Sequence, residues 1–357
     1  MRSKELSSLL TLFLCVGIGL AQNAYNQNNL TSDLSGVATH TDSKLVNPWG
    51  IAFFPGTSPA NPPSPIWVSD NNSGFTTLYD PAGNDLASFI IPPPPGSPAG
   101  TKATPTGIVA NTSSSKFSVA GNPSFFIFDT EDGTISGWTG GPAAVIAVDN
   151  STPASGEAVY KGLALIHNDD GDFLLAANFR NGKIEVYDQN FNAVELEGRF
   201  HAVSVPRGYA PFGVHVIGDR VFVTYAKQNP AKHDPVIGPG RGFVNEFDVE
   251  GRLVRRFAQR GVLDAPWGVV LAPASGFGTF SGALLIGNFG DGIINAFNPK
   301  TGALLGQVSN PDGTVIHNPG LWAMVFGSDI NHPSTMFFDA GILSEAHGLL
   351  GTISVAH

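Results

Sequence analysis

The stretch Asn47-Pro48-Trp49-Gly50-Ile51-Ala52 begins a pattern that returns five more times along this chain of 357 residues. Each copy has a turn residue, then a glycine or a large aromatic residue, and then an apolar segment. The later copies are Thr104-Pro105-Thr106-Gly107-Ile108-Val109, Tyr160-Lys161-Gly162-Leu163-Ala164, Ala210-Pro211-Phe212-Gly213-Val214, Ala265-Pro266-Trp267-Gly268-Val269 and Asn318-Pro319-Gly320-Leu321-Trp322-Ala323. With Gly50, Gly107, Gly162, Gly213, Gly268 and Trp322 as equivalent points, successive copies are 57, 55, 51, 55 and 54 residues apart. A period this regular indicates a repeat architecture.

Each repeat contains four short apolar strands, separated by turns rich in glycine, asparagine, aspartate and proline. In the first repeat these strands cover residues 50–54, 65–69, 75–79 and 86–91. Four-stranded sheets that repeat around an axis form a β-propeller, in which each blade covers the faces of its neighbours. The sequence therefore predicts an all-β, six-bladed β-propeller with blades near 47–91, 104–149, 160–200, 210–260, 265–309 and 318–355.

The sixth repeat lacks a fourth strand. Its three strands cover residues 321–326, 335–338 and 350–355, and no fourth apolar segment follows them. Residues 26–33 precede the first repeat and belong to no blade of their own. We expect this segment to supply the missing strand of the last blade, because an open ring would leave edge strands exposed.

The first residues predict a signal peptide. Arg2 and Lys4 precede an apolar run over residues 9–21 that ends in a small residue. A basic start, a short apolar run and a small residue at its end are typical of secretory signals. We expect residues 1–21 to be removed, leaving a propeller domain over 22–357 in a secreted protein, extracellular or periplasmic. The run is shorter than the roughly 20 apolar residues that span a bilayer, so no membrane span is expected.

Composition limits the partners of the chain. The net charge is −10, and 13% of the residues are charged. Phosphate binding needs clustered Lys and Arg, so we do not expect nucleic acid as a partner. Cys15 is the only cysteine and lies in the apolar N-terminal run, so we expect no disulfides. The expected partner is a protein, a glycan or a small molecule, and the chain is expected to be a monomer.

Several segments resemble known propellers. The repeat period, the Pro-aromatic-Gly starts and the segment Gly287-Asn288-Phe289-Gly290-Asp291-Gly292 resemble the six-bladed propellers of the NHL type. Residues 45–50, 128–138 and 223–228 are similar to segments of an uncharacterised family of secreted propeller proteins. This resemblance covers nearly all of the chain after residue 21. It implies the fold and export, and it carries no activity.

Propeller topology brings one end of every blade to a common face around the central axis. On that face we expect the ends of the second strands, which are Asp70, Asn71, Asp129, Asn178, Tyr225, Asn288 and Asp339. The starts of the first strands add Trp49, Thr106, Lys161, Phe212, Trp267 and His317. A polar centre with aromatic residues around it is a typical ligand site. The same Asp and Asn residues, followed by glycine, also fit ordinary hairpin turns, and that interpretation stays open.

The polar ring is also a candidate metal site. Oxygen ligands that converge on an axis suit a hard divalent cation such as Ca²⁺. The candidate ligands are Asp129, Asn178, Asn288 and Asp339. The ring resembles that of lactonase-like propellers, which hold a divalent ion with Glu, Asn and Asp. The glutamate that such propellers have at the start of a first strand is absent here.

The fourth repeat contains an insertion over residues 226–242, between its second and third strands. Loops longer than about 12 residues are uncommon and often functional. The insertion falls on the face of the ring, where it would act as a lid or a docking finger. A plain surface loop with a His233–Asp234 pair is the alternative. Tyr225, Lys227 and His233 are the candidate proton-transfer residues.

Two functions remain open from the sequence. The first is a secreted binding or scaffold module that presents one face to its partner. Its candidate ligand-binding residues are Trp49, Asp70, Asn71, Asp129, Asn178, Phe212, Tyr225, Lys227, His233, Trp267, Asn288 and Asp339. The second is a metal-assisted enzyme, similar to a lactonase or a lyase, with an axial divalent cation. The sequence contains no serine-hydrolase elbow and no phosphate-binding loop, which favours the binding module.

Overall fold

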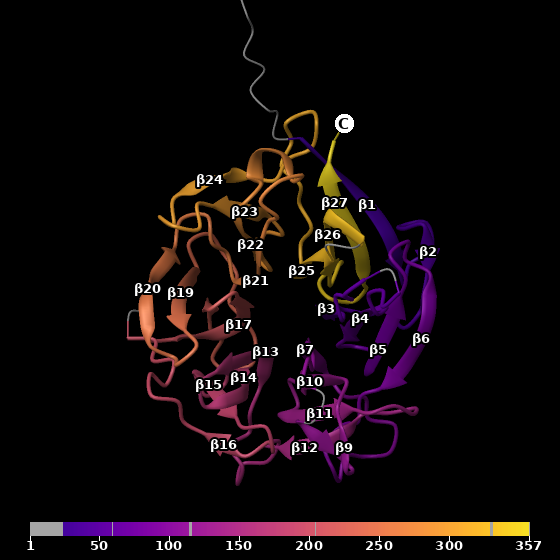
Figure 1. Cartoon of the computed structure of the whole chain (residues 1–357), viewed down its shortest axis with the longest axis vertical. Coiled ribbons are helices and arrows are strands. Elements are labelled where there is room, and N and C mark those ends of the chain that lie inside the picture. The colour runs from indigo at the N-terminus through magenta and orange to yellow at the C-terminus, as the bar shows by residue number, and fades with distance from the viewer. Residues whose placement is uncertain (1–23, 59, 114–115, 204, 329–330, 357) are drawn as a thin grey trace, which may run out of the picture.

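The computed structural model describes residues 24–356 apart from 59, 114–115, 204 and 329–330. Within these residues the chain forms β-strands and one 3₁₀ turn, Gly278–Phe280 (η1). Figure 1 shows six sheets arranged around a central axis, with the chain running from blade to blade in sequence order. The predicted all-β, six-bladed β-propeller is confirmed. The predicted signal peptide, residues 1–21, lies outside the described residues.

Five of the blades are four-stranded antiparallel sheets whose first strand lies nearest the axis (Figure 1). Blade one contains β3 (Pro48–Ala52), β4 (Ile66–Asp70), β5 (Phe75–Tyr79) and β6 (Asp85–Ile90). Blade two contains β7 (Pro105–Ala110), β10 (Phe126–Thr130), β11 (Thr134–Trp138) and β12 (Val145–Asp149), with a side hairpin of β8 (Ser118–Val119) and β9 (Asn122–Pro123). Blade three contains β13 (Tyr160–Asn168), β14 (Gly171–Asn178), β15 (Lys183–Tyr187) and β16 (Ala193–Val194). Blade four contains β17 (Tyr209–Ile217), β18 (Arg220–Lys227), β19 (Gly242–Asp248) and β20 (Leu253–Gln259). Blade five contains β21 (Pro266–Leu271), β22 (Leu284–Asn288), β23 (Ile294–Phe297) and β24 (Leu304–Gln307).

The sixth blade is completed by the N-terminal segment. It contains β25 (Leu321–Ser328), β26 (Asn331–Ala340) and β27 (Leu349–Val355), and β1 (Tyr25–Ser32) pairs antiparallel with β27. A short strand, β2 (His40–Thr41), adds to β1 in parallel. The predicted closing strand, residues 26–33, is therefore confirmed with a shift of one residue. Pairing with β1 removes the free edge of β27 that an open ring would leave.

A glycine near the start of most first strands lets adjacent blades approach closely. A Cβ atom added at Gly50 would lie 2.6 Å from the carbonyl oxygen of Thr106 in the next blade. A Cβ atom at Gly213 would lie 2.4 Å from the carbonyl oxygen of Trp267. Neither glycine has a left-handed φ. Gly50 and Gly213 are therefore explained by close backbone approach, which only a residue without Cβ allows.

Each blade also has a register shift where its first strand begins. Such a bulge leaves a backbone N–H without a partner in the sheet. In two blades the end of the second strand supplies the acceptor: Asp129 Oδ1 accepts from the Gly107 N–H at 2.6 Å, and Asp339 Oδ1 accepts from the Ala323 N–H at 2.7 Å. Ala323 therefore corresponds to Gly107, and the equivalent point of blade six lies one residue after Trp322. We call these bulges and their acceptors the collar.

Most of the core lies between neighbouring blades. One buried cluster surrounds the axis and includes Trp49, Phe212, Trp267 and Trp322. A second joins blades five and six to the closing strand, and its members include Tyr25 of β1. Because each blade depends on its neighbours for burial, closure of the ring stabilises all six. Among the described residues, no helix has the length and apolar character that crossing a membrane requires.

Candidate functional site

In each blade, the residue before the bulge position (Gly50, Gly107 and their equivalents) lies at the axis, and together these residues form a ring. This axial ring consists of Trp49, Thr106, Lys161, Phe212, Trp267 and Trp322. All six are at most 4% exposed. The first five were predicted at this place from the starts of the first strands. Trp322, rather than His317, takes the position in blade six.

Aromatic side chains close the axis. The rings of Trp49 and Trp322 stack with a centroid distance of 3.5 Å, and Trp267 meets Trp322 edge-on at 5.8 Å. Phe212 lies 5.6 Å and Phe289 lies 4.2 Å from the Trp322 ring, again between centroids. Aromatic pairs in such contact stabilise a protein by about 0.5–1.5 kcal/mol each beyond the area that they bury. The packed rings therefore give the space next to them a closed floor.

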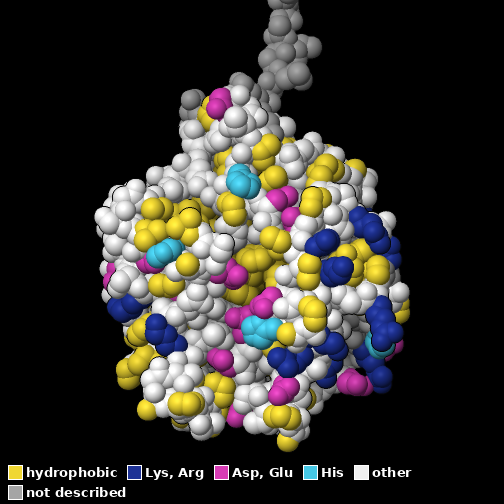
Figure 2. Space-filling view, turned by 180° about the vertical axis from the view of Figure 1, so that it is seen from behind, with side chains coloured by type: hydrophobic (Ala, Val, Ile, Leu, Met, Phe, Trp, Pro, Cys, Tyr) yellow, Lys and Arg dark blue, Asp and Glu magenta, His cyan; other side chains and the backbone are white. Residues whose placement is uncertain are grey.

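A cavity of about 360 Å³ lies on this aromatic floor. Figure 2 shows a hollow at the centre of one face, with hydrophobic side chains at its floor and acidic side chains and a histidine at its rim. All six blades line the cavity, through Asn47, Trp49, Asn71 and Asn72 of blade one, Glu131 of blade two, Lys161 of blade three, Asp234 and Pro235 of blade four, Phe289 of blade five, and Trp322, Ser344, Glu345 and Ala346 of blade six. A concave polar site with an apolar floor is a typical binding site. We call it the axial cavity.

Lys161 places a buried positive charge in the axial cavity. Its side chain is 1% exposed, its ammonium contacts Glu131 Oε1, and it lies 3.8 Å from Asp234 Oδ1. The ammonium is also 4.9 Å from the centroid of the Trp49 ring and 5.9 Å from that of Phe179. Removing an ammonium from water is costly unless carboxylates or ring faces replace the lost hydration. The surroundings of Lys161 supply both.

The cavity carboxylates are held by asparagines. Glu131 Oε2 accepts a hydrogen bond from Asn71 Nδ2 at 2.8 Å, and Glu345 Oε1 accepts one from Asn47 Nδ2 at 3.2 Å. Asn47, Ser344 and Glu345 have φ values of 51°, 57° and 64°, in the left-handed region that residues with a side chain rarely adopt. Such backbone strain is concentrated at functional sites in known proteins.

The charges of the axial cavity do not balance. Glu131, Asp234 and Glu345 carry three negative charges when ionised, against the single positive charge of Lys161. Burial raises the pKa of Glu345, whereas the hydrogen bond from His233 lowers the pKa of Asp234. At neutral pH the cavity is therefore negative, and it disfavours anionic ligands.

The insertion of blade four reaches the axial cavity. Near the start of the insertion, Gln228 Nε2 donates a hydrogen bond to the Phe179 carbonyl oxygen at 2.6 Å, which anchors the loop to blade three. Further along, His233 Nδ1 lies 2.8 Å from Asp234 Oδ1 and 3.9 Å from Glu131 Oε1. The two hypotheses for this loop, a lid or a plain surface loop, stay open as functions. The structure does place its His233–Asp234 pair beside Lys161 and Glu131.

The predicted metal ligands lie inside the blades, and they are Asp129, Asn178, Asn288 and Asp339. All four are fully buried and lie outside the lining of the axial cavity. Asp129 and Asp339 hold the collar, and Asn178 and Asn288 bond within their own turns, to Asn181 and Asp291. Burial raises the pKa of Asp129 to about 6 and that of Asp339 well above its usual range.

The turn interpretation accounts for these bonds. One oxygen each of Asp129, Asn288 and Asp339 nevertheless has no hydrogen-bond partner among the described residues. Each of them keeps the capacity to bind one further group. A cation held by these four residues therefore stays a prediction.

The other predicted ligand-binding residues fall into two groups. Trp49 and Asn71 line the axial cavity, and Phe212 and Trp267 form part of the ring beneath it. Asp70 is buried and accepts a hydrogen bond from Thr77 Oγ1 at 2.8 Å. The three candidate proton-transfer residues also lie in different parts of the molecule.

Of those three candidates, His233 lies at the axial cavity. Tyr225 is buried in the core between blades three and four. Lys227 is exposed at the end of β18.

Several site residues were missed from the sequence. Glu131 follows β10 within a hairpin turn, and Glu345 lies in the connection between β26 and β27. Phe289 and Trp322 contribute to the floor. A signal for Glu131 existed, because it sits two residues after the predicted Asp129 in a segment that resembles the secreted propellers. Glu345 had no such signal, since its backbone reaches the axis through a left-handed turn.

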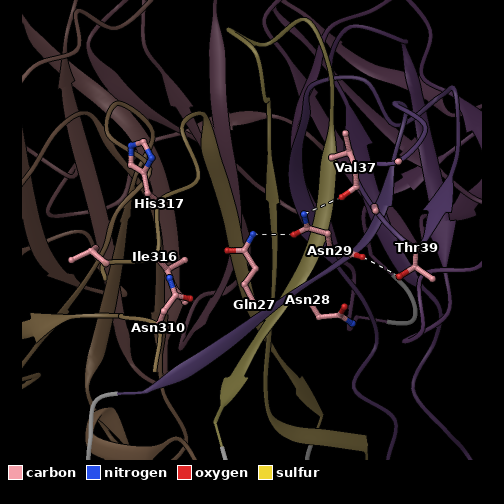
Figure 3. A pocket seen from close by; sticks show the side chains of 11 residues that line it. Gln27, Asn28, Asn29, Val37, Thr39, Asn310, Ile316 and His317 are labelled. Atoms are coloured by element: carbon pink, nitrogen blue, oxygen red, sulfur yellow. Dashed lines mark hydrogen bonds between the residues drawn. The ribbon is translucent and has the colours of Figure 1, made fainter. Parts of the chain in front are cut away.

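A second cavity, of about 670 Å³, lies where the N-terminal segment closes the ring. Figure 3 shows Gln27 and Asn29 of β1 between Asn310 and His317 on one side and Thr39 on the other. Gln27 Nε2 donates to Asn29 Oδ1 at 2.9 Å, and Asn29 Nδ2 donates to the Val37 carbonyl oxygen at 3.1 Å. These amides already satisfy one another. The axial cavity, with its unbalanced charges, is the stronger candidate site.

The fold and the axial cavity define the chain as a six-bladed β-propeller closed at its axis by aromatic side chains. No known family profile matches the chain. It belongs to the family of two uncharacterised proteins of Acanthamoeba polyphaga mimivirus, R648 and L690. It is 31% identical to R648 over 344 residues, which cover 93% of this chain and 81% of that protein. It is 31% identical to L690 over 338 residues, which cover 91% and 84%.

A solved structure supports the fold. A glucose dehydrogenase is 12% identical with a TM-score of 0.54, covering 93% of this chain and 100% of that one. The virginiamycin B lyase from Staphylococcus aureus is 11% identical with a TM-score of 0.48, covering 93% and 99%. The glucose dehydrogenase, at 12% identity, shows the propeller fold alone, because propellers carry many unrelated functions.

Proposed function

We propose that the protein is a secreted propeller binding module whose axial cavity holds the end of a saccharide. The observation that carries this proposal is the convergence of polar side chains from five blades on one cavity, whose aromatic floor includes Phe289 of the remaining blade. Sugar hydroxyls both donate and accept hydrogen bonds, and asparagine and carboxylate side chains offer both kinds of partner. The apolar face of a sugar ring packs against aromatic side chains.

Trp49 supports a ligand with oxygen atoms. Its indole N–H has no acceptor among the described residues, although the side chain is only 2% exposed and lines the cavity. The other two tryptophans of the axial ring donate to acceptors, Trp267 to the Lys161 carbonyl oxygen and Trp322 to Asn47 Oδ1. A buried donor without an acceptor costs about 1–3 kcal/mol. A ligand hydroxyl would remove that cost.

The volume and the charge of the axial cavity limit which ligands fit it. The cavity of about 360 Å³ is near the lower end of ligand pockets, which span roughly 300–1,000 Å³. It therefore fits one or two sugar rings rather than a long chain. The excess of carboxylates selects neutral and amino sugars over acidic ones.

The test is a glycan array probed with the purified chain, followed by calorimetry on the glycans that bind. Neutral or amino-sugar termini should bind, and acidic termini should not. Glu131→Gln and Asn71→Ala should each weaken binding at least tenfold. Glu197→Gln removes a carboxylate that is 74% exposed and lies outside the cavity, so this control should bind like the wild type. Binding that survives Glu131→Gln unchanged would refute the proposal.

A second function, the metal-assisted lactonase- or lyase-like enzyme, has one observation in its favour. Two pairs of proton-transfer groups lie side by side at the cavity: Lys161 contacts Glu131, and His233 Nδ1 lies 2.8 Å from Asp234 Oδ1. Groups within hydrogen-bond reach of one another are what acid–base catalysis requires. Incubation of the chain with lactones and with unsaturated or uronic glycans tests this function. Turnover that is lost in His233→Ala would favour the enzyme over the binding module.

Secretion is part of the proposal. Its support is the basic and apolar N-terminal pattern, since residues 1–21 lie outside the described part of the chain. Expression of the full chain with mass spectrometry of its N-terminus tests export. A start at residue 22 in the exported fraction is expected, and a chain retained in the cell with residue 1 intact would contradict it.

A further inference from the structure

Three side chains that can bind a metal ion meet at the rim of the axial cavity. Glu131, His233 and Asp234 each offer a ligand atom within 4.8 Å of the other two. His233 Nδ1 is 2.8 Å from Asp234 Oδ1 and 3.9 Å from Glu131 Oε1. Adjacent ligands of a tetrahedral ion with bonds of about 2.1 Å lie about 3.4 Å apart, which is between these two distances. We propose that these three residues bind a divalent first-row transition-metal ion such as Zn²⁺.

The donor set decides the class of ion. One imidazole nitrogen and two carboxylate oxygens suit Zn²⁺ and its neighbours, whereas Ca²⁺ takes six to eight oxygen ligands. His233 would bind through Nδ1 and carry its proton on Nε2. Three protein ligands leave a coordination position open. Because Asp234 and Glu131 line the axial cavity, that position faces a space where a small molecule can enter.

The charge of the cluster is an independent argument. The Lys161 ammonium already contacts Glu131 and lies close to Asp234, so the fold stabilises positive charge at this point. With Glu345 included, three carboxylates face one ammonium. A divalent ion with neutral His233 would bring the sum to zero. The same geometry makes Lys161 a competitor of the ion for two of its ligands.

A second histidine pair in the chain provides a matched control. His167 Nδ1 lies 2.7 Å from Asp172 Oδ1, and Lys116 Nζ lies 2.9 Å from Asp172 Oδ2. This pair has the same histidine, carboxylate and lysine as the axial group. It lacks a second carboxylate within reach of the histidine among the described residues. In that part of the chain, the group of three possible metal ligands is the axial one.

The experiment is a titration of the metal-free chain with Co²⁺ and Zn²⁺, followed by absorption spectroscopy and calorimetry. The wild type should bind one ion, and Co²⁺ should give the visible bands of a four-coordinate site. Glu131→Gln, Asp234→Asn and His233→Ala should each weaken binding at least tenfold. His167→Ala should bind like the wild type. Lys161→Met should bind at least threefold more tightly, because it removes the competing ammonium.

Each other outcome overturns the proposal. These are no binding of either ion at millimolar concentration, equal loss in His167→Ala, or affinities unchanged by the three ligand substitutions. Thermal unfolding of every variant shows whether it is folded; if Lys161→Met is not, the three ligand variants decide. The titration contains no saccharide, so its result is independent of the function proposed above.

Discussion

Asp129 and Glu131 are two residues apart in blade two, yet they belong to two different regions. Asp129 is one of the two carboxylates of the collar, fully buried and bonded to the Gly107 N–H. Glu131 stands in the turn after β10, where it contacts Lys161 and lines the axial cavity. The chain leaves the sheet after Thr130, so the pleat no longer dictates where the next side chain lies. The collar therefore holds the blades together, and the turns beyond it carry the site.

The largest effect should come from the collar glycines. Gly107→Ala should lower the free energy of unfolding by about 3 kcal/mol, the upper end for overpacking, because its Cβ would lie 2.4 Å from the Leu163 backbone nitrogen. Gly162→Ala is the control, since its Cβ would be 3.3 Å from the nearest atom, Gly213 Cα. Denaturant unfolding should show a clearly smaller loss for this variant. Equal losses would mean that close approach does not explain the collar.

The collar should also respond to pH. The pKa of Asp129 is raised from 3.8 to about 6 by burial, so the folded protein holds an extra proton between these values. The stability that this proton gives is lost as pH rises from about 4 to about 6. Asp129→Asn lacks this loss, so its stability relative to wild type should rise by about 2–3 kcal/mol from pH 4 to pH 7. A relative stability that does not change with pH would contradict the assignment.

A smaller effect is expected for the buried ion pair of the site. Lys161→Met and Glu131→Gln should each destabilise the chain, and the double variant should lose less than the sum. A coupling free energy of about 1–2 kcal/mol is expected for contacting charges, with Asn71 still bonded to Glu131 in the absence of the lysine. Denaturant unfolding of the four proteins measures it. Additive losses would show that the pair does not interact.

The smallest effect should come from the insertion. His233 is 39% exposed, and His233→Ala should change the free energy of unfolding by less than about 0.5 kcal/mol. His215→Ala is the contrast, because the partly buried His215 ring packs edge-on against Trp267, its Nε2 lies 2.8 Å from the Trp267 carbonyl oxygen, and desolvation lowers its pKa to about 4. That variant should lose about 2 kcal/mol. A large loss for His233→Ala would place the insertion in the fold rather than in the site.

Much of the site was within reach of the sequence, but its chemistry was not. The repeat placed Trp49, Lys161, Phe212 and Trp267 at the axis, because equivalent positions of a propeller lie at equivalent radii. It also predicted ligand and metal sites at the Asp and Asn residues that end the second strands. Asp129 and Asp339 bond the collar, and Asn178 and Asn288 bond their own turns, whereas Asn71 lines the axial cavity and donates to Glu131. Local hydrogen bonding and ligand binding use the same residue types, so one sequence cannot separate them.

The sequence by itself determined the six blades, the missing strand of the last blade and the N-terminal segment that replaces it. These follow from local patterns, namely strand period, turn residues and a regular repeat. The tertiary structure alone decided that Trp322 closes the ring and that Glu131, His233, Asp234 and Glu345 surround Lys161. These residues come from different blades through irregular turns. Their meeting depends on how far each loop reaches toward the axis, which no local pattern encodes.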